Sequence, residues 1–461
     1  MSSVTKLFAK QALLPQGWAN NVTVELDEAG KIQTVTANCP AAPKDAEQIQ
    51  GVLLPGIANC HSHAFQRIMV GLTEKRGKGD DSFWTWRDTM YRSLEKIGPE
   101  ELQAISEQLY LEMLLHGYTG VAEFHYLHHA QDGRPYSNPA EMSHRVIAAA
   151  QNVGLHITHL PVLYCHSDFG AQPPQTGQRR FVHALDDYQS LLQTLHQHYS
   201  TEQNVHLGIA PHSLRAVSEP LLDEAIRSLN RLDPNAPIHI HIAEQMREVD
   251  ASLAYHGARP VAWLLDHFAV DKRWCLIHAT HLNGDECRDL AHSGAIAGLC
   301  PTTEANLGDG IFAATDYCKH GGRFAIGSDS QVTLNPAEEL RLLEYGQRLI
   351  HQKRSLLAAG SDSSVGEYLF RHALAGGAQA LGIDTGAIRA GARADFLVLN
   401  DQHPSLYGKQ GANLLDSWIF AGHGNPVKDV MVAGQWRVRD GQHPQNEQIA
   451  SRFRQVLDKL F

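Results

Sequence analysis

Hydrophobic and polar positions divide the chain into two kinds of segment. Residues 1–54 alternate apolar and polar positions between Gly and Asn turns, and the same alternation returns at residues 394–400 and 427–439. A period of two is typical of half-buried strands joined by hairpins. Because chain termini often lie close in space, we expect the two ends to form one β unit together.

The middle of the chain has a different pattern, in which helices and strands alternate. Helical spacing of apolar positions predicts helices at residues 100–116, 139–152 and 186–199. Short β-branched runs predict strands at residues 118–124, 157–163 and 205–210. Repeated units of this kind favour a parallel barrel or a doubly wound sheet. A last helix is predicted near the end of the chain. Gly, Pro and charged residues predict mobile loops over a site at residues 76–82 and 167–180.

Length and composition narrow the class of protein. The chain has 461 residues, of which 43% are hydrophobic and 19% charged, so we expect a large barrel with a smaller folded domain rather than disorder. The net charge of −11 argues against bulk nucleic-acid binding. No segment approaches the ~18 uninterrupted apolar residues of a membrane span. The seven cysteines are dispersed without a C-x-x-C pair, which favours reduced thiols and a cytoplasmic location.

A short histidine motif follows the first apolar run of the central region. His61 and His63 lie two residues apart directly after Pro55-Gly56. On an extended segment both imidazoles face the same side, so they can bind one metal ion. The pattern is common by chance in a chain with 28 histidines. It gains weight only if further candidate ligands occur at the ends of later strands.

Three later strand-like runs do end in such residues. They are followed directly by His241 and Glu244, by His278, and by Asp329. In a parallel barrel the C-terminal ends of the strands converge on one site, so the sequence predicts a single metal centre. His239 remains open as an alternative to His241, because alternation places both on one face. His281 is the corresponding alternative to His278, although we expect it in the loop.

The residue types define the expected chemistry. His61, His63, His241 and Asp329 make a suitable ligand set for one divalent ion, Zn2+ or another first-row metal, with a position left for water. Such an ion lowers the pKa of water to about 7. Asp329 is placed to accept the proton, His278 to orient the water, and Glu244 to pass a proton to a leaving nitrogen.

These residues and their neighbours resemble the amidohydrolase superfamily in its deaminase branch. The resemblance is carried by Pro55-Gly56, Asn59, His61-Ser-His63, His241-x-x-Glu244, His278, Ser328-Asp329 and the glycine-spaced segment 386–395. It implies an α/β fold, a distorted TIM (β/α)8 barrel with a smaller β-sandwich domain. The implied parts are the barrel at 55–385, the β-sandwich at 1–54 and 386–445, and a C-terminal helix at 446–461. The implied cofactor is one divalent metal ion, with Zn2+ expected.

Longer strings resemble the formimidoylglutamate deiminases of histidine degradation within that superfamily. They are residues 61–67, 83–87, 122–129, 212–217 and 303–310. The resemblance implies hydrolysis of N-formimidoyl-L-glutamate to N-formyl-L-glutamate and ammonia, and a homodimer. This substrate carries two carboxylates, which the planar fork of arginine suits best. The substrate-contacting positions of that family match Gln66, Arg87, Tyr126, His212 and Arg215.

Two other functions remain to be weighed. A related deaminase would act on guanine, cytosine or an adenosine derivative, but such flat rings do not need two arginines. A non-catalytic barrel homologue should have lost ligands, whereas every expected ligand is present. Trp84 and Trp86 are open between lining the pocket and packing under a loop, and Gln331 has no assigned role. We therefore expect a small-molecule substrate, and neither nucleic acid nor membrane as a partner.

Overall fold

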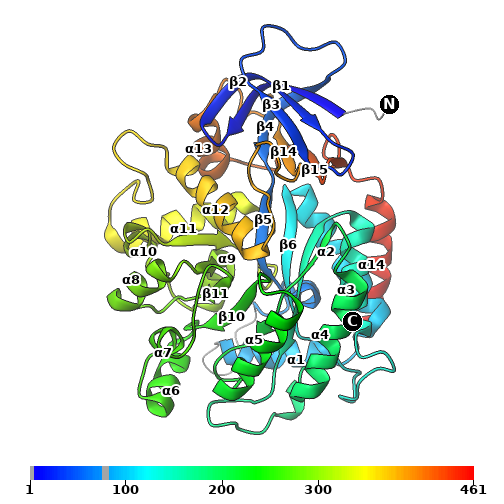
Figure 1. Cartoon of the computed structure of the whole chain (residues 1–461), viewed down its shortest axis with the longest axis vertical. Coiled ribbons are helices and arrows are strands. Elements are labelled where there is room, and N and C mark those ends of the chain that lie inside the picture. Colours follow the sequence, from blue (N-terminus) through cyan, green and yellow to red (C-terminus); the bar gives the residue numbers. More distant parts are fainter. Residues whose placement is uncertain (1–4, 75–82) are drawn as a thin grey trace.

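The chain is described by a computed structural model that covers residues 5–74 and 83–461. The predicted loop at 76–82 lies outside these residues. Figure 1 shows a small β unit at one end of the molecule and a larger α/β body below it. The histidine motif lies at the start of the larger body, where strand β5 (Ile57–Ser62) leads away from the β unit.

Both ends of the chain contribute strands to the small β unit. One mixed sheet has the order β16-β15-β14-β4-β1-β2-β3. The two ends meet where β14 pairs antiparallel with β4, with Phe396 opposite Pro55. The strands are β1 (Thr5–Leu14), β2 (Gly17–Leu26), β3 (Ile32–Thr36), β4 (Glu47–Pro55), β14 (Phe396–Leu399), β15 (Val427–Val432) and β16 (Gln435–Val438).

Parallel strands form the centre of the larger body. One sheet has the order β5-β6-β7-β8, with β9 also paired to β7, and a second has the order β10-β11-β12-β13. Isolated parallel bridges between Ser62 and Asp329 and between Ile209 and Ile238 join the edges of the two sheets. The further strands are β6 (Tyr118–His125), β7 (His156–Leu163), β8 (Val205–Leu207), β9 (Ala210–Pro211), β10 (Ile238–Ile242), β11 (Trp274–His278), β12 (Ile296–Leu299) and β13 (Arg323–Ile326).

The strand predicted at 205–210 is interrupted in the structure. It divides into β8 and β9 around Gly208. A Cβ atom at Gly208 would lie 2.5 Å from the carbonyl oxygen of Pro237. The segment before β10 therefore lies too close to the backbone of Gly208 for a regular hydrogen-bonded strand to continue there. This break turns the chain so that the residues after β9 enter the site.

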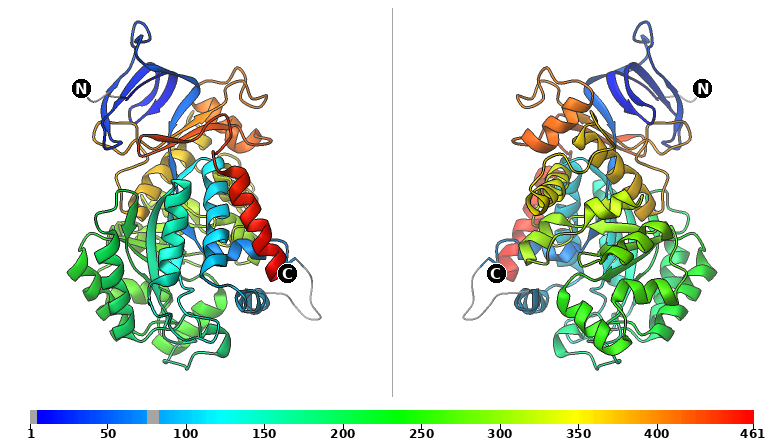
Figure 2. Two further views of the ribbon diagram at one scale, coloured as in Figure 1. Left: turned by 90° about the vertical axis from the view of Figure 1, so that its right-hand side faces the viewer. Right: turned by 90° about the vertical axis from the view of Figure 1, so that its left-hand side faces the viewer.

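Helices surround the parallel strands, and Figure 2 shows them from two further sides. The C-terminal helix α14 packs against α2, which places the end of the chain on the larger body and not on the β unit. The helices are α1 (Phe83–Leu94), α2 (Pro99–Leu115), α3 (Glu141–Val153), α4 (Leu185–Tyr199), α5 (Glu219–Leu232), α6 (Met246–His256), α7 (Pro260–His267), α8 (Gly284–Ser293), α9 (Pro301–Leu307), α10 (Ala314–Lys319), α11 (Pro336–His351), α12 (Val365–Leu381), α13 (Ala412–Ala421) and α14 (Asn446–Leu460), with short 3-10 helices η1 (Ala64–Met69) and η2 (Thr176–Gln178).

The predicted helices are found within two residues of their expected bounds, because their apolar spacing was regular and their ends carry stop signals. Helix α3, for example, ends at Gly154, whose φ of 78° lies in the left-handed region that glycine adopts without strain. Among residues 5–74 and 83–461, we find no helix with both the length and the apolar character required to cross a membrane.

Candidate active site

The candidate site lies where the parallel strands end. His61 is in β5, His241 is in β10, and His278 is the last residue of β11. Backbone bonds hold the segment after β13 against β5, since the N–H of Asp329 donates to the carbonyl of His61 over 3.0 Å. The φ angles of His278 (68°) and Asp329 (43°) are in the left-handed region, so strained backbone aims both side chains at one point.

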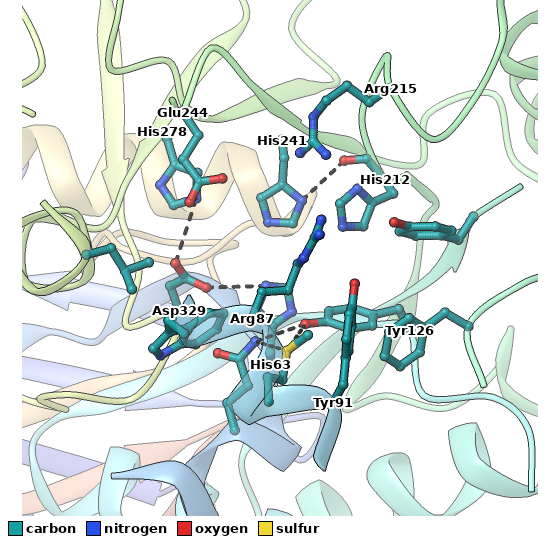
Figure 3. A pocket seen from close by; sticks show the side chains of 16 residues that line it. His63, Arg87, Tyr91, Tyr126, His212, Arg215, His241, Glu244, His278 and Asp329 are labelled. Atoms are coloured by element: carbon teal, nitrogen blue, oxygen red, sulfur yellow. Dashed lines mark hydrogen bonds and ion pairs between the residues drawn. The ribbon is translucent and has the colours of Figure 1, made fainter. Parts of the chain in front are cut away.

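The four predicted metal ligands converge. Asp329 Oδ1 lies 3.4 Å from His61 Nε2 and 3.3 Å from His63 Nε2. His241 Nε2 lies 3.1 Å from His61 Nε2. The four side chains are almost completely buried, and the ligand atoms of His63, His241 and Asp329 face one another in Figure 3.

Two of these rings are held in a defined tautomer. His63 Nδ1 lies 2.9 Å from the carbonyl of Phe124, and His241 Nδ1 lies 3.2 Å from the carbonyl of His212. Each Nδ1–H therefore donates outward, which leaves the unprotonated Nε2 facing the centre. Burial lowers the pKa of His61 to about 3 and also lowers the pKa values of His63 and His241.

This donor set fits a divalent cation. Neutral imidazoles and a carboxylate direct lone pairs at one point, an arrangement that is repulsive without a cation between them. Four ligands around an ion at about 2.0–2.2 Å lie roughly 3.3–3.6 Å apart in a tetrahedron. The observed separations of 3.1–3.4 Å are close to that spacing. His61, His63, His241 and Asp329 would hold the ion.

The geometry also separates the two alternatives that periodicity left open. His239 lies two residues before His241 on the same strand and is buried. Its Nε2 lies 2.8 Å from the carbonyl of Ala380 at the end of α12. His281 is in the loop after β11 and does not line the pocket. His241 and His278 are therefore the histidines that face the site.

Three charged groups stand beside the ligands. His278 Nε2 lies 3.8 Å from Glu244 Oε1 and 3.7 Å from Asp329 Oδ2. Its Nδ1 lies 3.2 Å from Glu304 Oε1, which fixes the ring. Although burial opposes the charged form, Glu244, Glu304 and Asp329 raise the pKa of His278. Burial also raises the pKa of Glu244, to about 7, so this carboxyl can hold a proton near neutral pH.

One pocket opens onto this centre and collects the predicted residues. Every predicted site residue except His61 lines it, and His61 lies directly beneath. The lining side chains are His63, Gln66, Trp86, Arg87, Met90, Tyr91, Tyr126, Tyr164, Phe181, His212, Arg215, His241, Glu244, His278, Leu307 and Asp329. Trp86 thus borders the pocket, whereas the side chain of Trp84 lies outside the described part of the structure.

The pocket has two chemically different walls. We call Glu244, His278 and Asp329 the catalytic wall, and Arg87, Tyr126, His212 and Arg215 the recognition wall. Figure 3 shows the catalytic wall on one side, Arg215, His212 and Tyr126 on the other, and Arg87 reaching in between.

Arg215 of the recognition wall has a buried polar atom that no protein group satisfies within the described residues. Its side chain is nine-tenths buried, and its Nε has no hydrogen-bond partner within the described residues. A buried Nε–H without an acceptor is costly unless a ligand satisfies it. Arg87 comes from helix α1 and reaches into the same pocket. The recognition wall therefore fits a ligand that carries carboxylates.

Several residues in or beside the pocket were not anticipated from the sequence. Tyr164 directly follows β7, so the strand-end rule that found His278 would also have found it. Tyr91 and Glu304 lie on helices α1 and α9, where no local signal marks them. Gln331 proves to support the site from below: its Nε2 donates to Ser62 Oγ over 3.0 Å, and it does not line the pocket.

Comparisons with known proteins identify the family of the chain. A model of the amidohydrolase family matches residues 52–437, and a model of the N-terminal domain of formimidoylglutamate deiminase HutF matches residues 4–49. Formimidoylglutamate deiminase from Pseudomonas aeruginosa is 50% identical over 457 residues, which cover 99% of this chain and 100% of that protein. An 8-oxoguanine deaminase from the same organism is 27% identical and covers 85% of this chain and 83% of its own length.

Solved structures give the same picture. An amidohydrolase from Brucella melitensis superposes with a TM-score of 0.93 at 46% identity and covers 99% of both chains. An adenosine deaminase from Xanthomonas campestris with bound zinc superposes with a TM-score of 0.81 at 22% identity, covering 99% of this chain and 98% of its own, a likeness of fold. The chain belongs to the amidohydrolase family and, within it, to the formimidoylglutamate deiminases.

Proposed function

We propose that this protein hydrolyses N-formimidoyl-L-glutamate to N-formyl-L-glutamate and ammonia in histidine degradation. The observation that carries the proposal is the presence of two guanidinium groups and a cation-binding donor set in one pocket. The substrate needs both, since its amidine carbon must meet activated water while its two carboxylates are bound. The relative from Pseudomonas aeruginosa that is half identical over its whole length supports the same activity.

The proposal includes a finer description of the fold. Parallel bridges at both edges of the two parallel sheets support a distorted (β/α)8 barrel over residues 55–385. The mixed sheet from both chain ends supports a smaller β domain made of residues 1–54 and 386–445, with 446–461 as a C-terminal helix. A site at the C-terminal strand ends is where barrels of this kind carry their chemistry.

We infer that the metal ion is Zn2+ or another first-row divalent ion, since three imidazoles and one carboxylate suit such a borderline ion. When bound, it lowers the pKa of a coordinated water to about 7 and polarises the group under attack. A zinc ion is present in the adenosine deaminase from Xanthomonas campestris that shares this fold.

The residues of the catalytic wall supply the proton transfers. Asp329 lies between the ligand nitrogens and His278, so it is placed to accept a proton from the attacking water. His278, held by Glu304, is placed to hold the attacking oxygen. Water adds to the carbon of the formimidoyl C=N bond, and the terminal nitrogen takes up the proton that the water loses. The hydroxyl of the adduct then loses its proton as the formyl carbonyl forms and the bond to the terminal nitrogen breaks. Glu244, whose pKa is raised to about 7 by burial, delivers the proton with which that nitrogen leaves as ammonia.

The residues of the recognition wall hold the glutamate part. Arg215 and Arg87 supply the charge that two carboxylates require, and His212 and Tyr126 supply further polar contacts. Bidentate contacts to guanidinium groups also fix the orientation of a carboxylate. This orientation places the amidine at the opposite, catalytic wall.

The direct test is ammonia release by the zinc-loaded protein from N-formimidoyl-L-glutamate, compared with guanine and adenosine. We expect turnover of the linear amidine and none of the rings. N-formimidoylglycine, which has one carboxylate, should be a much poorer substrate because one arginine then faces no partner. Turnover of a ring without turnover of N-formimidoyl-L-glutamate would overturn the proposal.

A further inference from the structure

One of the three tyrosines that line the substrate pocket lies at the end of β7. Tyr164 follows Leu163 directly, is 5% exposed and lines the pocket. Its ring centroid lies 4.7 Å from that of His212, a member of the recognition wall. Burial raises the pKa of Tyr164, so its hydroxyl keeps its proton. The hydroxyl is therefore available as a hydrogen-bond donor.

The direction of that hydrogen bond is set by Gln178. Its Nε2 donates to the hydroxyl oxygen of Tyr164 over 2.7 Å. The backbone N–H of Gln175 donates to Gln178 Oε1 over 2.7 Å, which fixes the amide with its NH2 group toward the tyrosine. Because the phenol oxygen already accepts this bond, its own O–H is left to donate elsewhere.

The position of Gln178 is itself fixed. The side chain is fully buried in the short helix η2. Two residues later, the buried guanidinium of Arg180 donates to the carbonyls of Ile97 and His129 over 2.8 and 2.9 Å. These bonds tie the end of the loop at 167–180 to the segments that follow α1 and β6. The loop therefore holds Gln178 against the tyrosine.

The opposite side of the recognition wall repeats the arrangement. Gln66 Nε2 donates to the hydroxyl of Tyr126 over 2.9 Å, and both residues were expected to contact substrate. The pocket thus contains two Gln–Tyr pairs, in each of which the amide donates to the phenol oxygen. Only the pair of Gln66 and Tyr126 had been marked by the sequence.

We propose that the Tyr164 hydroxyl donates a hydrogen bond to one of the substrate carboxylates beside Arg215, and that Gln178 is a positioning residue that makes this hydroxyl a donor. The inference rests on the proposed function, because it names a further contact for the same substrate. It assigns Tyr164 a role in binding and none in the transfer of protons at the amidine.

The first test is Tyr164→Phe in the metal-loaded enzyme. A hydrogen bond to a charged group is lost, so KM for N-formimidoyl-L-glutamate should rise at least about 10-fold while kcat changes less than about 3-fold. The Kd of glutarate, a dicarboxylate that cannot react, should weaken by a similar factor in calorimetry. Unchanged KM and unchanged Kd would overturn the inference.

Tyr188→Phe is the matched control. Tyr188 is fully buried, and its hydroxyl donates to the carbonyl of Pro161 over 2.9 Å, away from the pocket. Its removal should lower stability without changing KM or the Kd of glutarate. An equal rise of KM in both variants would mean that loss of any buried hydroxyl is responsible, and would overturn the specific role of Tyr164.

Gln178→Glu tests the direction of the hydrogen bond. A carboxylate oxygen facing the tyrosine would accept its O–H and turn it away from the pocket, so KM should rise at least as much as in Tyr164→Phe. When Gln178→Glu is added to Tyr164→Phe, the further rise of KM should be clearly smaller, because no hydroxyl remains to be redirected. Equal costs in both backgrounds would indicate charge repulsion alone and would overturn the positioning role.

The two proposals fail in different ways. If the wild-type enzyme releases no ammonia from N-formimidoyl-L-glutamate, the proposed function is wrong, and the Kd of glutarate in wild type and Tyr164→Phe still decides whether the hydroxyl binds a carboxylate. If the wild type is active and Tyr164→Phe binds both compounds normally, the function stands and the further inference is wrong.

Discussion

The two walls of the pocket are built from different parts of the molecule. The catalytic wall comes from the ends of the parallel strands β10, β11 and β13, which backbone pairing holds in fixed register. The recognition wall combines helix α1 with segments that follow β6 and β9. Both walls therefore include residues at strand ends, and only the recognition wall also includes a residue from a helix, Arg87 of α1, so its shape depends in part on how α1 packs against the strands.

The largest expected effect concerns the catalytic wall. Glu244→Gln keeps the shape of the side chain but removes the proton that the leaving nitrogen takes. We expect kcat to fall by about 10²–10⁴-fold with little change in KM, because general acid catalysis contributes about that much. Steady-state ammonia release and metal analysis check this prediction, with the metal content expected to stay at the wild-type level.

Two histidines on one strand provide the control for this result. His241→Ala should lose the metal together with activity, since a ligand is removed. His239→Ala should keep the metal, because that ring contacts the carbonyl of Ala380 instead. A Glu244→Gln variant with near-normal kcat, or with no metal, would contradict the division of roles within the catalytic wall.

The next effect concerns the recognition wall. Arg215→Met preserves much of the buried volume but leaves a substrate carboxylate without its partner. Truncating one member of a buried charge pair costs about 2–5 kcal/mol, so KM should rise on the order of 10²-fold or more, with a smaller change in kcat. Steady-state kinetics with N-formimidoyl-L-glutamate measure both constants. A loss confined to kcat would mean that Arg215 acts on the reaction and not on binding.

The difference between the walls also explains what the sequence could predict. Strand-end residues such as His278 and Asp329 could be predicted for two reasons. An apolar, β-branched run predicts each strand, and parallel strands end at one edge of the sheet. Periodicity could not separate His239 from His241, since both face one side of β10. The structure distinguishes them, because His239 contacts the end of α12 whereas His241 contacts His61.

The recognition wall was less accessible to sequence reasoning. Arg87 and Arg215 were identified by resemblance, because no periodic pattern marks a loop or helix residue that reaches into a pocket. Tyr91 and Glu304 depend on how helices pack against the strands, which a local pattern does not reveal. Tyr164 could have been found, since it directly follows a predicted strand.

A second group of buried histidines, His125, His128 and His183, lies behind the recognition wall and can be compared with the histidines of the site. The ring centroids of His128 and His183 are 4.3 Å apart, and those of His125 and His128 are 5.2 Å apart. Among the described residues, the groups whose ligand atoms converge include the histidines of the site and none of these three. Burial of several histidines side by side therefore does not by itself bring their ligand atoms to one point.

The smallest effect follows from this second group. Burial lowers the pKa of His183 from its ordinary value of 6.5 to about 3, so below pH 6.5 the unfolded chain binds a proton that the folded protein does not. This residue should reduce the free energy of unfolding by about 1 kcal/mol between pH 6.5 and pH 5.5. In His183→Gln that loss should be absent, so the difference in unfolding free energy from the wild type should shrink by the same amount over this interval. Urea unfolding at both pH values measures it, with the exposed His292→Gln as control. A difference that is the same at both values would mean that the pKa of His183 is the same in the folded and the unfolded chain, and that burial behind the recognition wall does not keep this ring neutral.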